Sequence, residues 1–209
     1  MAILIGCEES QVICGAFRAA GFETYSCDIL PTRGNPDWHY QGDIMEVLPL
    51  RRWDIAILHP DCTYMAVCNN RQAAKGKFNH HLRLRDIEWT KKLWNLAKAH
   101  SLRVALENPA SVIFPHLRKI GAVVQYIHPY QHGHMEQKKT GLALHGLPKL
   151  TTTNDVYAEM MQLSVAERER VFYMPPGPNR ARDRSETYSG ISSAVVSQWG
   201  RLLHQELRF

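Results

Sequence analysis

Short apolar runs alternate with segments of helical periodicity through the first half of the chain, and this alternation constrains the fold more than any other feature. Runs typical of buried or half-buried strands occur at residues 2–5, 22–27, 40–43, 54–58 and 103–106. Helices with one apolar side are expected at residues 11–20 and 85–100. The alternation predicts an α/β fold of Rossmann-like type, in which helices cover both faces of a mostly parallel sheet.

The second half of the chain predicts a different strand pairing. Residues 122–127 and 141–144 have the pattern of strands and lack a clear helix between them, which favours an antiparallel pair. A helix with one apolar face is expected at residues 190–207. We expect one domain over residues 1–209, in which residues 151–189 form a short variable segment that contains a loop rich in proline and glycine.

Composition excludes several classes of protein. The 209 residues include 44% apolar side chains, enough for one full globular core. No apolar run approaches the ~20 residues of a transmembrane helix and no secretory signal is visible, so we expect no membrane association. The five cysteines include no C-x-x-C pair and the 11 histidines lack ligand spacing, so we expect a reducing cytoplasm and no metal site. The net charge of +5 permits a polyanionic partner.

Polar side chains follow each expected parallel strand at the point where it ends. Ligands bind outside the carboxyl ends of the strands in open α/β sheets, so these side chains together predict a site. They lie at residues 6–10, Asp28, Asp43, residues 60–63 and residues 107–108. The acids also have simpler interpretations: Asp28 as a turn residue, Asp43 as the cap of a helix that begins near Ile44, and Glu107 as part of a surface turn.

Asp28 points to an adenosine-containing cofactor. It follows the first turn by about 20 residues, the spacing at which nucleotide-binding α/β folds place an acid for the ribose hydroxyls. The first turn has no G-x-G-x-x-G sequence, so the dinucleotide fingerprint is absent.

Cys62 is the candidate nucleophile. It follows a strand and a proline at the expected rim, and a thiolate is the best soft nucleophile among the side chains. The alternative is that Cys62 is a small loop residue. Cys68, within the sequence Ala66-Val67-Cys68, has the surroundings of a packing residue.

These motifs, in their order, resemble those of the cytosine-5 DNA methyltransferases, and more closely a short branch of that family in phage genomes. The matching segments are residues 4–28, GDI at 42–44, HPDCTYMA at 59–66, ENP at 107–109, HGHMEQKKTGLALHGLP at 132–148 and RSETYSGISSAVVSQWG at 184–200. The resemblance implies a single catalytic domain with the Rossmann-like fold of methyltransferases that use S-adenosylmethionine.

The chain also departs from the pattern of this family. Asp61 stands where the family usually has a proline before the cysteine, and a carboxylate there disfavours the thiolate. Thr63 replaces a common glutamine, and Glu8-Glu9 stand in place of a glycine-rich loop. Residues 151–184 are too few for the long recognition region of ordinary family members.

The resemblance assigns catalytic roles to Cys62, Glu107 and Asn108. Cys62 is expected to add to carbon 6 of cytosine, which makes carbon 5 nucleophilic. Glu107 is expected to hydrogen-bond the N3 and amino edge of the base and to supply a proton, for which its pKa should be raised. Asn108 is expected to shape the turn that presents Glu107.

The implied cofactor is S-adenosylmethionine, which leaves as S-adenosylhomocysteine. Asp28 is expected to bind its ribose, Asp43 its adenine amino group, and Glu8 or Glu9 its ammonium group. The full set of expected cofactor contacts is Gly6, Glu8, Glu9, Ser10, Asp28, Ile29, Asp43, Ile44, Pro60, Ser192 and Ser193.

The implied substrate is cytosine in DNA, flipped out of any duplex at a cost of a few kcal/mol. The expected substrate or DNA contacts are Thr63, Lys138, Lys139, Thr140, Arg180, Arg182 and Arg184. A solvated surface is the alternative interpretation of the arginines.

Two other hypotheses stay open at this point. The enzyme acts on a free cytosine nucleotide such as deoxycytidine monophosphate, or the chain is an inactive DNA-binding relative. We take a monomer as the starting assumption, in the cytoplasm of a phage-infected or lysogenic bacterial host.

Overall fold

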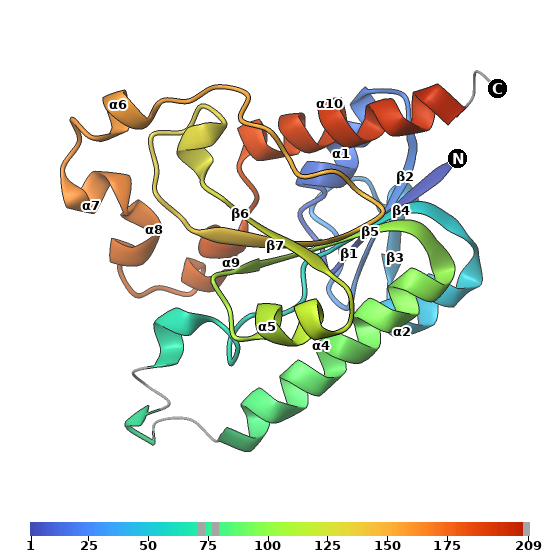
Figure 1. Cartoon of the computed structure of the whole chain (residues 1–209), viewed down its shortest axis with the longest axis horizontal. Helices are drawn as coiled ribbons and strands as arrows, with labels where there is room; N and C mark the ends of the chain where they lie inside the picture. Colours follow the sequence, from blue (N-terminus) through green and yellow to red (C-terminus); the bar gives the residue numbers. More distant parts are fainter. Residues whose placement is uncertain (71–73, 77–79, 207–209) are drawn as a thin grey trace.

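A computed structural model describes residues 1–70, 74–76 and 80–206 of the chain (Figure 1). Seven strands form one sheet in the order β3-β2-β1-β4-β5-β7-β6. The strands are β1 (Ala2–Gly6), β2 (Glu23–Asp28), β3 (His39–Gln41), β4 (Trp53–Leu58), β5 (Ser101–Pro109), β6 (Val123–Ile127) and β7 (Thr140–His145). Strands β1 to β5 run parallel, whereas β7 runs antiparallel to both of its neighbours. The predicted mostly parallel α/β fold and the predicted antiparallel pair are confirmed.

Alternate residues of the strands face two separate core layers. Ile3 and Ile55 pack on the side covered by α1 (Val12–Ala19) and α10 (Ser189–Glu206). Leu4 and Ala56 pack on the opposite side, where α4 (His80–His100) and α5 (Ile113–Lys119) lie. Helices therefore cover both faces, as predicted. The expected final helix extends to Leu207, which lies outside the described residues.

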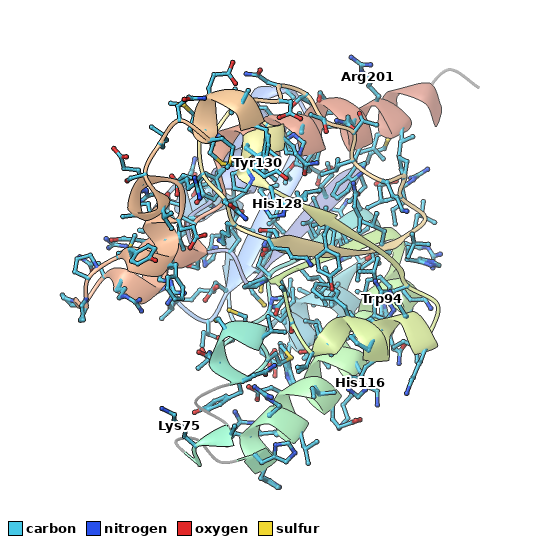
Figure 2. All side chains as sticks on the ribbon, turned by 60° about the vertical axis from the view of Figure 1, so that its left-hand side comes forward. Lys75, Trp94, His116, His128, Tyr130 and Arg201 are labelled. Atoms are coloured by element: carbon cyan, nitrogen blue, oxygen red, sulfur yellow. The ribbon has the colours of Figure 1, made fainter. Side chains whose placement is uncertain are left out.

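The long helix α4 supplies Trp94, which together with Trp53 of β4 is one of the largest buried side chains of this layer. Trp94 is fully buried beneath it, and Figure 2 shows this ring inside the packed part of the molecule. The helix begins at His80, five residues before the predicted start at residue 85. Its extra turn exposes His80, His81 and Leu84 to solvent, so no apolar periodicity marked it in the sequence.

Several short elements were not predicted. Helix α5 has seven residues and carries Pro115 in its first turn, where a missing N–H is tolerated. Residues 151–189 contain four short helices rather than an open loop: α6 (Tyr157–Met160), α7 (Val165–Arg168), α8 (Arg170–Tyr173) and α9 (Arg180–Ser185). Helix α2 (Ile44–Val47) begins where the interpretation of Asp43 as a cap expected a helix. The 3-10 turns were not predicted: η1 (Pro36–Trp38), η2 (Leu48–Leu50), η3 (Val67–Asn69) and η4 (Pro129–Gln131). In the described part of the chain, no helix has the length and apolar character needed to cross a bilayer.

Candidate active site

The strand order reverses between β1 and β4, which makes the carboxyl end of this strand pair the expected ligand site of an open α/β sheet. Gly6 ends β1, and its carbonyl accepts a hydrogen bond from the backbone N–H of His59 at 2.9 Å. A Cβ atom on Gly6 would lie 2.7 Å from side-chain atoms of Ile44 and Leu58. The absence of a side chain at Gly6 therefore lets three strands and helix α2 converge at this edge.

The loop that carries Cys62 is fastened to the end of β5. The side-chain amide of Asn108 is buried and donates to the carbonyl of Pro60 at 3.0 Å. The buried hydroxyl of Ser111 donates to the carbonyl of Met65 at 3.1 Å. These two bonds hold the loop on both sides of Cys62. The side chain of Asn108 thus fastens the Cys62 loop, a contact different from the predicted shaping of the turn that presents Glu107.

The Cys62 thiol is half-buried at this corner. Burial, then the charges of Glu107 and Asp61, raise its pKa to about 11, while the charge of Lys138 acts in the opposite direction. The thiol is therefore protonated at neutral pH. The predicted influence of Asp61 is present, although its carboxylate accepts hydrogen bonds from the backbone N–H and hydroxyl of Thr63 and is exposed.

Glu107 has a partner that we did not predict. Its carboxylate oxygen Oε2 lies 3.2 Å from Nδ1 of His59. Burial alone would raise the pKa of Glu107, but the hydrogen bond and charge of His59 lower it below its ordinary value. The expectation of a raised pKa is therefore wrong for this state of the protein. His59 directly precedes Pro60 at the end of β4, and this position at a strand end was the signal in the sequence that could have identified it.

Lys138 belongs to the same corner, because its charge acts on all three groups. It opposes the raised pKa values of Cys62 and His59 and contributes to the lowered pKa of Glu107. Its ammonium donates to the carbonyl of Arg184 at 2.9 Å and lies 5.8 Å from the ring of Tyr188. Lys139 and Thr140, the other predicted substrate contacts in this segment, have different surroundings. Lys139 lies 4.5 Å from the ring of Tyr126. Thr140 is buried and its hydroxyl donates to the carbonyl of Lys138, so its side chain is not offered to a duplex.

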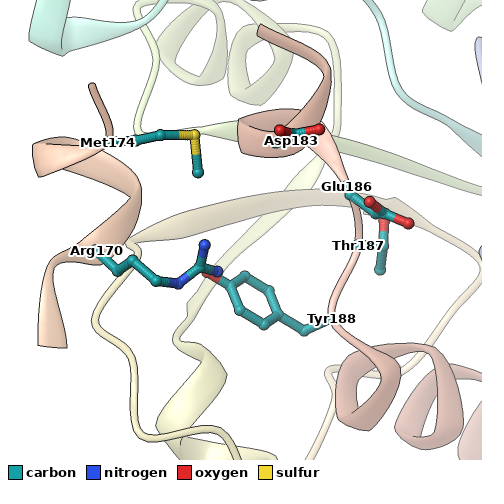
Figure 3. Close-up of a pocket in the computed structure, with 6 residues that line it drawn as sticks. All are labelled: Arg170, Met174, Asp183, Glu186, Thr187 and Tyr188. Carbon is teal, nitrogen blue, oxygen red and sulfur yellow. The ribbon is translucent and has the colours of Figure 1, made fainter. Parts of the chain in front are cut away.

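A hollow of about 340 Å³ lies between α8, α9 and the start of α10 (Figure 3). It is lined by Arg170, Met174, Asp183, Glu186, Thr187 and Tyr188. The Tyr188 hydroxyl donates to Glu136 at 2.9 Å, and Arg170 forms an ion pair with the same carboxylate at 2.9 Å. Tyr188 thus joins the hollow to the Lys138 side of the site.

The three predicted arginines lie on α9. Arg180 donates to the carbonyl of Met174 at 2.7 Å, and exposed Arg182 pairs with its neighbour Asp183 at 3.0 Å. Arg184 is half-buried, and its Nε atom has no hydrogen-bond partner among the described residues. Of the three, Arg182 is exposed whereas Arg180 and Arg184 are half-buried, so the interpretation as a solvated surface fits Arg182 best.

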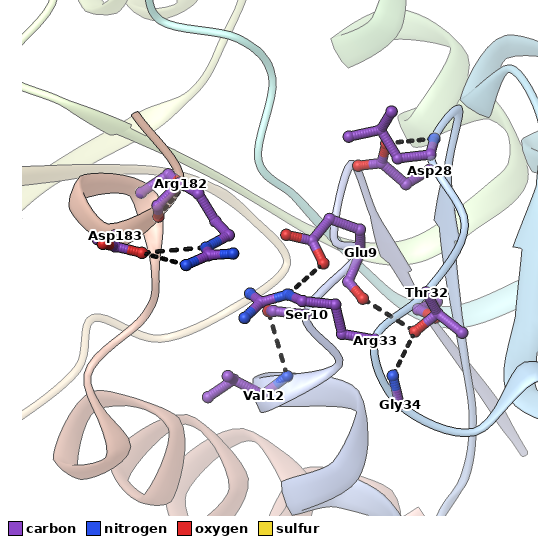
Figure 4. A network of polar contacts seen from close by, with 12 residues as sticks. Glu9, Ser10, Val12, Asp28, Thr32, Arg33, Gly34, Arg182 and Asp183 are labelled. Atoms are coloured by element: carbon purple, nitrogen blue, oxygen red, sulfur yellow. Dashed lines mark hydrogen bonds and ion pairs between the residues drawn. The ribbon is translucent and has the colours of Figure 1, made fainter. Parts of the chain in front are cut away.

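The turn between β1 and α1 gathers the acids Glu8 and Glu9. The buried carboxylate of Glu8 accepts hydrogen bonds from the backbone N–H groups of Ile13 and Cys14 at 2.7 and 3.2 Å. Glu8 therefore satisfies the free amides at the start of α1. Glu9 pairs with Arg33 at 2.7 Å, and Figure 4 shows this pair facing Arg182 and Asp183. Ser10 accepts from Val12 at 3.4 Å in the same turn.

The acids after β2 and β3 both form local turns. Oδ1 of Asp28 accepts from the N–H of Leu30, and Oδ1 of Asp43 accepts from the N–H of Met45, each at 2.9 Å. The interpretations as a turn residue and as a helix cap are thus both confirmed. Ile29 projects into solvent with 73% of its surface exposed, while Ile44 is buried.

The two predicted serines lie in the first turns of α10. Ser192 is buried and its hydroxyl donates to the carbonyl of Ser189 at 2.9 Å, whereas Ser193 is exposed. Figure 4 shows the start of this helix beside α1 and Ser10. No group of three metal-binding side chains occurs within residues 1–70, 74–76 and 80–206.

No protein-family profile and no curated protein matches the chain. Among solved structures, the S. pombe Dnmt2 methyltransferase is 12% identical, over 96% of this chain and 66% of that one, with a TM-score of 0.45. The Entamoeba histolytica methyltransferase EhMeth is 10% identical, over 74% of this chain and 57% of that one, with a TM-score of 0.49. The bifunctional kinase-methyltransferase WbdD is 15% identical, over 72% of this chain and 36% of that one, with a TM-score of 0.45. This chain thus spans between 36% and 66% of their lengths. Because these likenesses are distant, the fold assignment rests on the strand order of the sheet itself.

Proposed function

We propose that the chain transfers a methyl group from S-adenosylmethionine to carbon 5 of cytosine in DNA, through a covalent bond to Cys62. The observation that carries the proposal is that two different sets of side chains lie on the two sides of the point where the strand order reverses. Acids lie at or just after the ends of β1, β2 and β3 on one side of the reversal point. On the other side, Cys62 follows β4 and Glu107 lies near the end of β5. This division suits a cofactor on one side and a reacting base on the other.

The donor groups of the cofactor fit the residues on the acidic side. Ribose hydroxyls, an adenine amino group and an ammonium group are all donors, and Glu9, Asp28 and Asp43 offer carboxylate acceptors. Exposed Ile29 offers an apolar surface for a planar ring beside Asp28. Both carboxylate oxygens of Glu8 accept from α1, whereas Glu9 uses one oxygen in its pair with Arg33, so we assign the ammonium contact to Glu9. When bound, the cofactor supplies an electrophilic methyl group on a positively charged sulfur.

The residues of the chain activate the base. The Cys62 sulfur bonds to carbon 6 and its proton leaves to water, while Glu107 hydrogen-bonds N3 and the exocyclic amino group. The resulting electron-rich carbon 5 takes the methyl group. Water then takes the carbon 5 proton, and the electron pair of that bond restores the ring and expels the Cys62 sulfur as a thiolate. Asn108 keeps the Cys62 loop in register with Glu107 through its bond to Pro60.

The DNA is held by cations near the same edge. Lys138 lies against the Cys62 corner, and Arg182 is exposed on α9, so these two are the phosphate contacts that the geometry supports best. We assign the catalytic role to one domain over residues 1–209, with residues 151–189 in place of a recognition domain.

A free cytosine nucleotide is the second candidate substrate. Helices α6 to α9 have only four to six residues each, which is a small surface for reading a duplex. A mononucleotide needs no such surface.

The test uses methyl-labelled S-adenosylmethionine with unmodified duplex DNA and, in parallel, deoxycytidine monophosphate. Duplex DNA that contains 5-fluorocytosine traps the adduct, because its carbon 5 has no proton to lose. We expect trapping by the wild type and by Cys68→Ser, and none by Cys62→Ser. Cys68 is exposed on η3 near Cys62, which makes it a matched control. Full activity of Cys62→Ser would refute the mechanism, label only in the mononucleotide would select the second substrate, and no label in either would indicate an inactive relative.

A further inference from the structure

We propose that His59 holds the proton that Glu107 delivers to the substrate base, so that the two side chains act as one acid. This inference rests on the proposed function, and it adds to that function a residue with no assigned role.

The register of the sheet places the two side chains side by side. Leu58 of β4 pairs with Leu106 of β5, so the residues that follow, His59 and Glu107, are neighbours at the strand ends. The N–H of His59 donates to Gly6 at 2.9 Å, which fixes the backbone of the histidine. Its Nδ1 atom lies 3.2 Å from Oε2 of Glu107. An ionised carboxylate only accepts, so the shared proton resides on Nδ1.

The surroundings of His59 favour its charged form. The carboxylates of Glu107 on β5 and Glu8 in the β1–α1 turn face it, against the ammonium of Lys138 ahead of β7. Burial alone would lower the pKa of His59, but the two carboxylates raise it above its ordinary value. The Nε2 atom is buried and has no hydrogen-bond partner among the described residues, so Glu107 is the contact that orients the ring.

This arrangement solves a problem in the proposed reaction. Glu107 has a lowered pKa and is ionised at neutral pH, so it has no proton of its own for N3. When the Cys62 sulfur bonds to carbon 6, negative charge builds on N3, and N3 takes a proton from Glu107. Glu107 takes the Nδ1 proton of His59 in the same step, which leaves a neutral imidazole. When the sulfur is expelled, the N3 proton returns along the same route, so the pair ends in its starting state.

The first test replaces His59 by asparagine. The amide of His59→Asn has a donor near the position of Nδ1 but cannot give up a proton, so we expect kcat to fall about 10²-fold or more with little change in KM. The alkaline limb of the pH profile should move to lower pH, because Glu107 then has to carry the proton without its partner. His100→Asn, at the opposite end of α4 from the site, is the matched control and should behave as wild type.

Histidine side-chain NMR gives a reading that does not need turnover. In the intact protein, we expect the His59 resonance to titrate above the ordinary histidine range and to move to lower pH in Glu107→Gln. A methyltransferase whose His59→Asn variant keeps the wild-type pH profile would overturn the inference while leaving the proposed function intact. A wild-type protein that methylates no cytosine substrate would instead refute the proposed function. The NMR titration still tests the proton sharing in that case: a His59 pKa that is the same in Glu107→Gln and in the wild type would refute it.

Discussion

Nδ1 of His59 and Oε2 of Glu107 lie 3.2 Å apart at the ends of adjacent parallel strands. The pair ties the strand that presents Cys62 to the strand that presents the acid. It also lowers the pKa of Glu107, which we expected to be raised, because a cationic partner stabilises the carboxylate. The stability of this edge therefore depends on the charge states of both side chains.

The pair predicts a pH-dependent contribution to stability. The lowered pKa of Glu107 stabilises the fold at pH values above its ordinary value of 4.5, and this contribution is lost as pH falls through the lowered value. The raised pKa of His59 stabilises the fold at pH values below its ordinary value of 6.5, and this is lost as pH rises through the raised value. His59→Asn should thus lower the free energy of unfolding most between these two values, by roughly 1.5–3 kcal/mol. Urea denaturation across pH measures this, and a loss that grows steadily toward alkaline pH would contradict it.

Removing a negative neighbour should activate the Cys62 thiol. Its pKa of about 11 is raised by burial and by the charges of Glu107 and Asp61. Asp61→Asn should therefore shift alkylation of Cys62 by iodoacetamide to lower pH, with a rate at pH 8 up to about tenfold higher for one pKa unit. The measurement uses a Cys68→Ser background and peptide mass spectrometry. An unchanged rate profile would show that the Asp61 charge does not reach the sulfur.

The neighbouring acids Glu8 and Glu9 should differ in their effect on stability. Glu8→Ala leaves two backbone N–H groups of α1 without their buried acceptor, so we expect a loss of about 1–3 kcal/mol. Glu9→Ala removes a partly exposed ion pair with Arg33, for which we expect less than about 1 kcal/mol. Paired urea unfolding curves compare the two, and equal losses would argue against the capping role of Glu8.

Helix α10 should tolerate no side chain at Gly190. A Cβ atom there would collide with the backbone carbonyl of His132, which has no flexible end to move aside. Gly190→Ala should therefore destabilise the fold by about 1–3 kcal/mol. Gly15→Ala in α1 is the control, because its Cβ meets nothing within 4 Å and alanine favours the helix by up to about 1 kcal/mol. A thermal shift that ranks these two variants in the opposite order would refute this packing.

The sheet was predictable because its strands are short apolar runs between clear turn signals. The central strand at residues 54–58 and the antiparallel pair that ends in β7 both follow from such patterns. The short helices were not predictable. Helix α5 and helices α6 to α9 have only four to seven residues, too few turns for a helical periodicity to show.

The candidate site was predictable as a set of positions but not as a set of interactions. The strand ends identified Cys62 and Glu107, since carboxyl ends of parallel strands share an edge. The state of Glu107 depends on His59, 48 positions earlier in the chain, and only the register between β4 and β5 brings the two together. Glu8 and Asp43 were both expected at a ligand, and both accept hydrogen bonds from helix starts; the sequence suggested this use for Asp43 but not for Glu8.

Methyl transfer from labelled S-adenosylmethionine to unmodified duplex DNA, with Cys62→Ala run in parallel, tests the central claim most directly. The account predicts label on carbon 5 of cytosine with the wild-type chain and none with Cys62→Ala. Label of equal amount with Cys62→Ala would contradict the claim that this edge of the sheet attacks cytosine through Cys62.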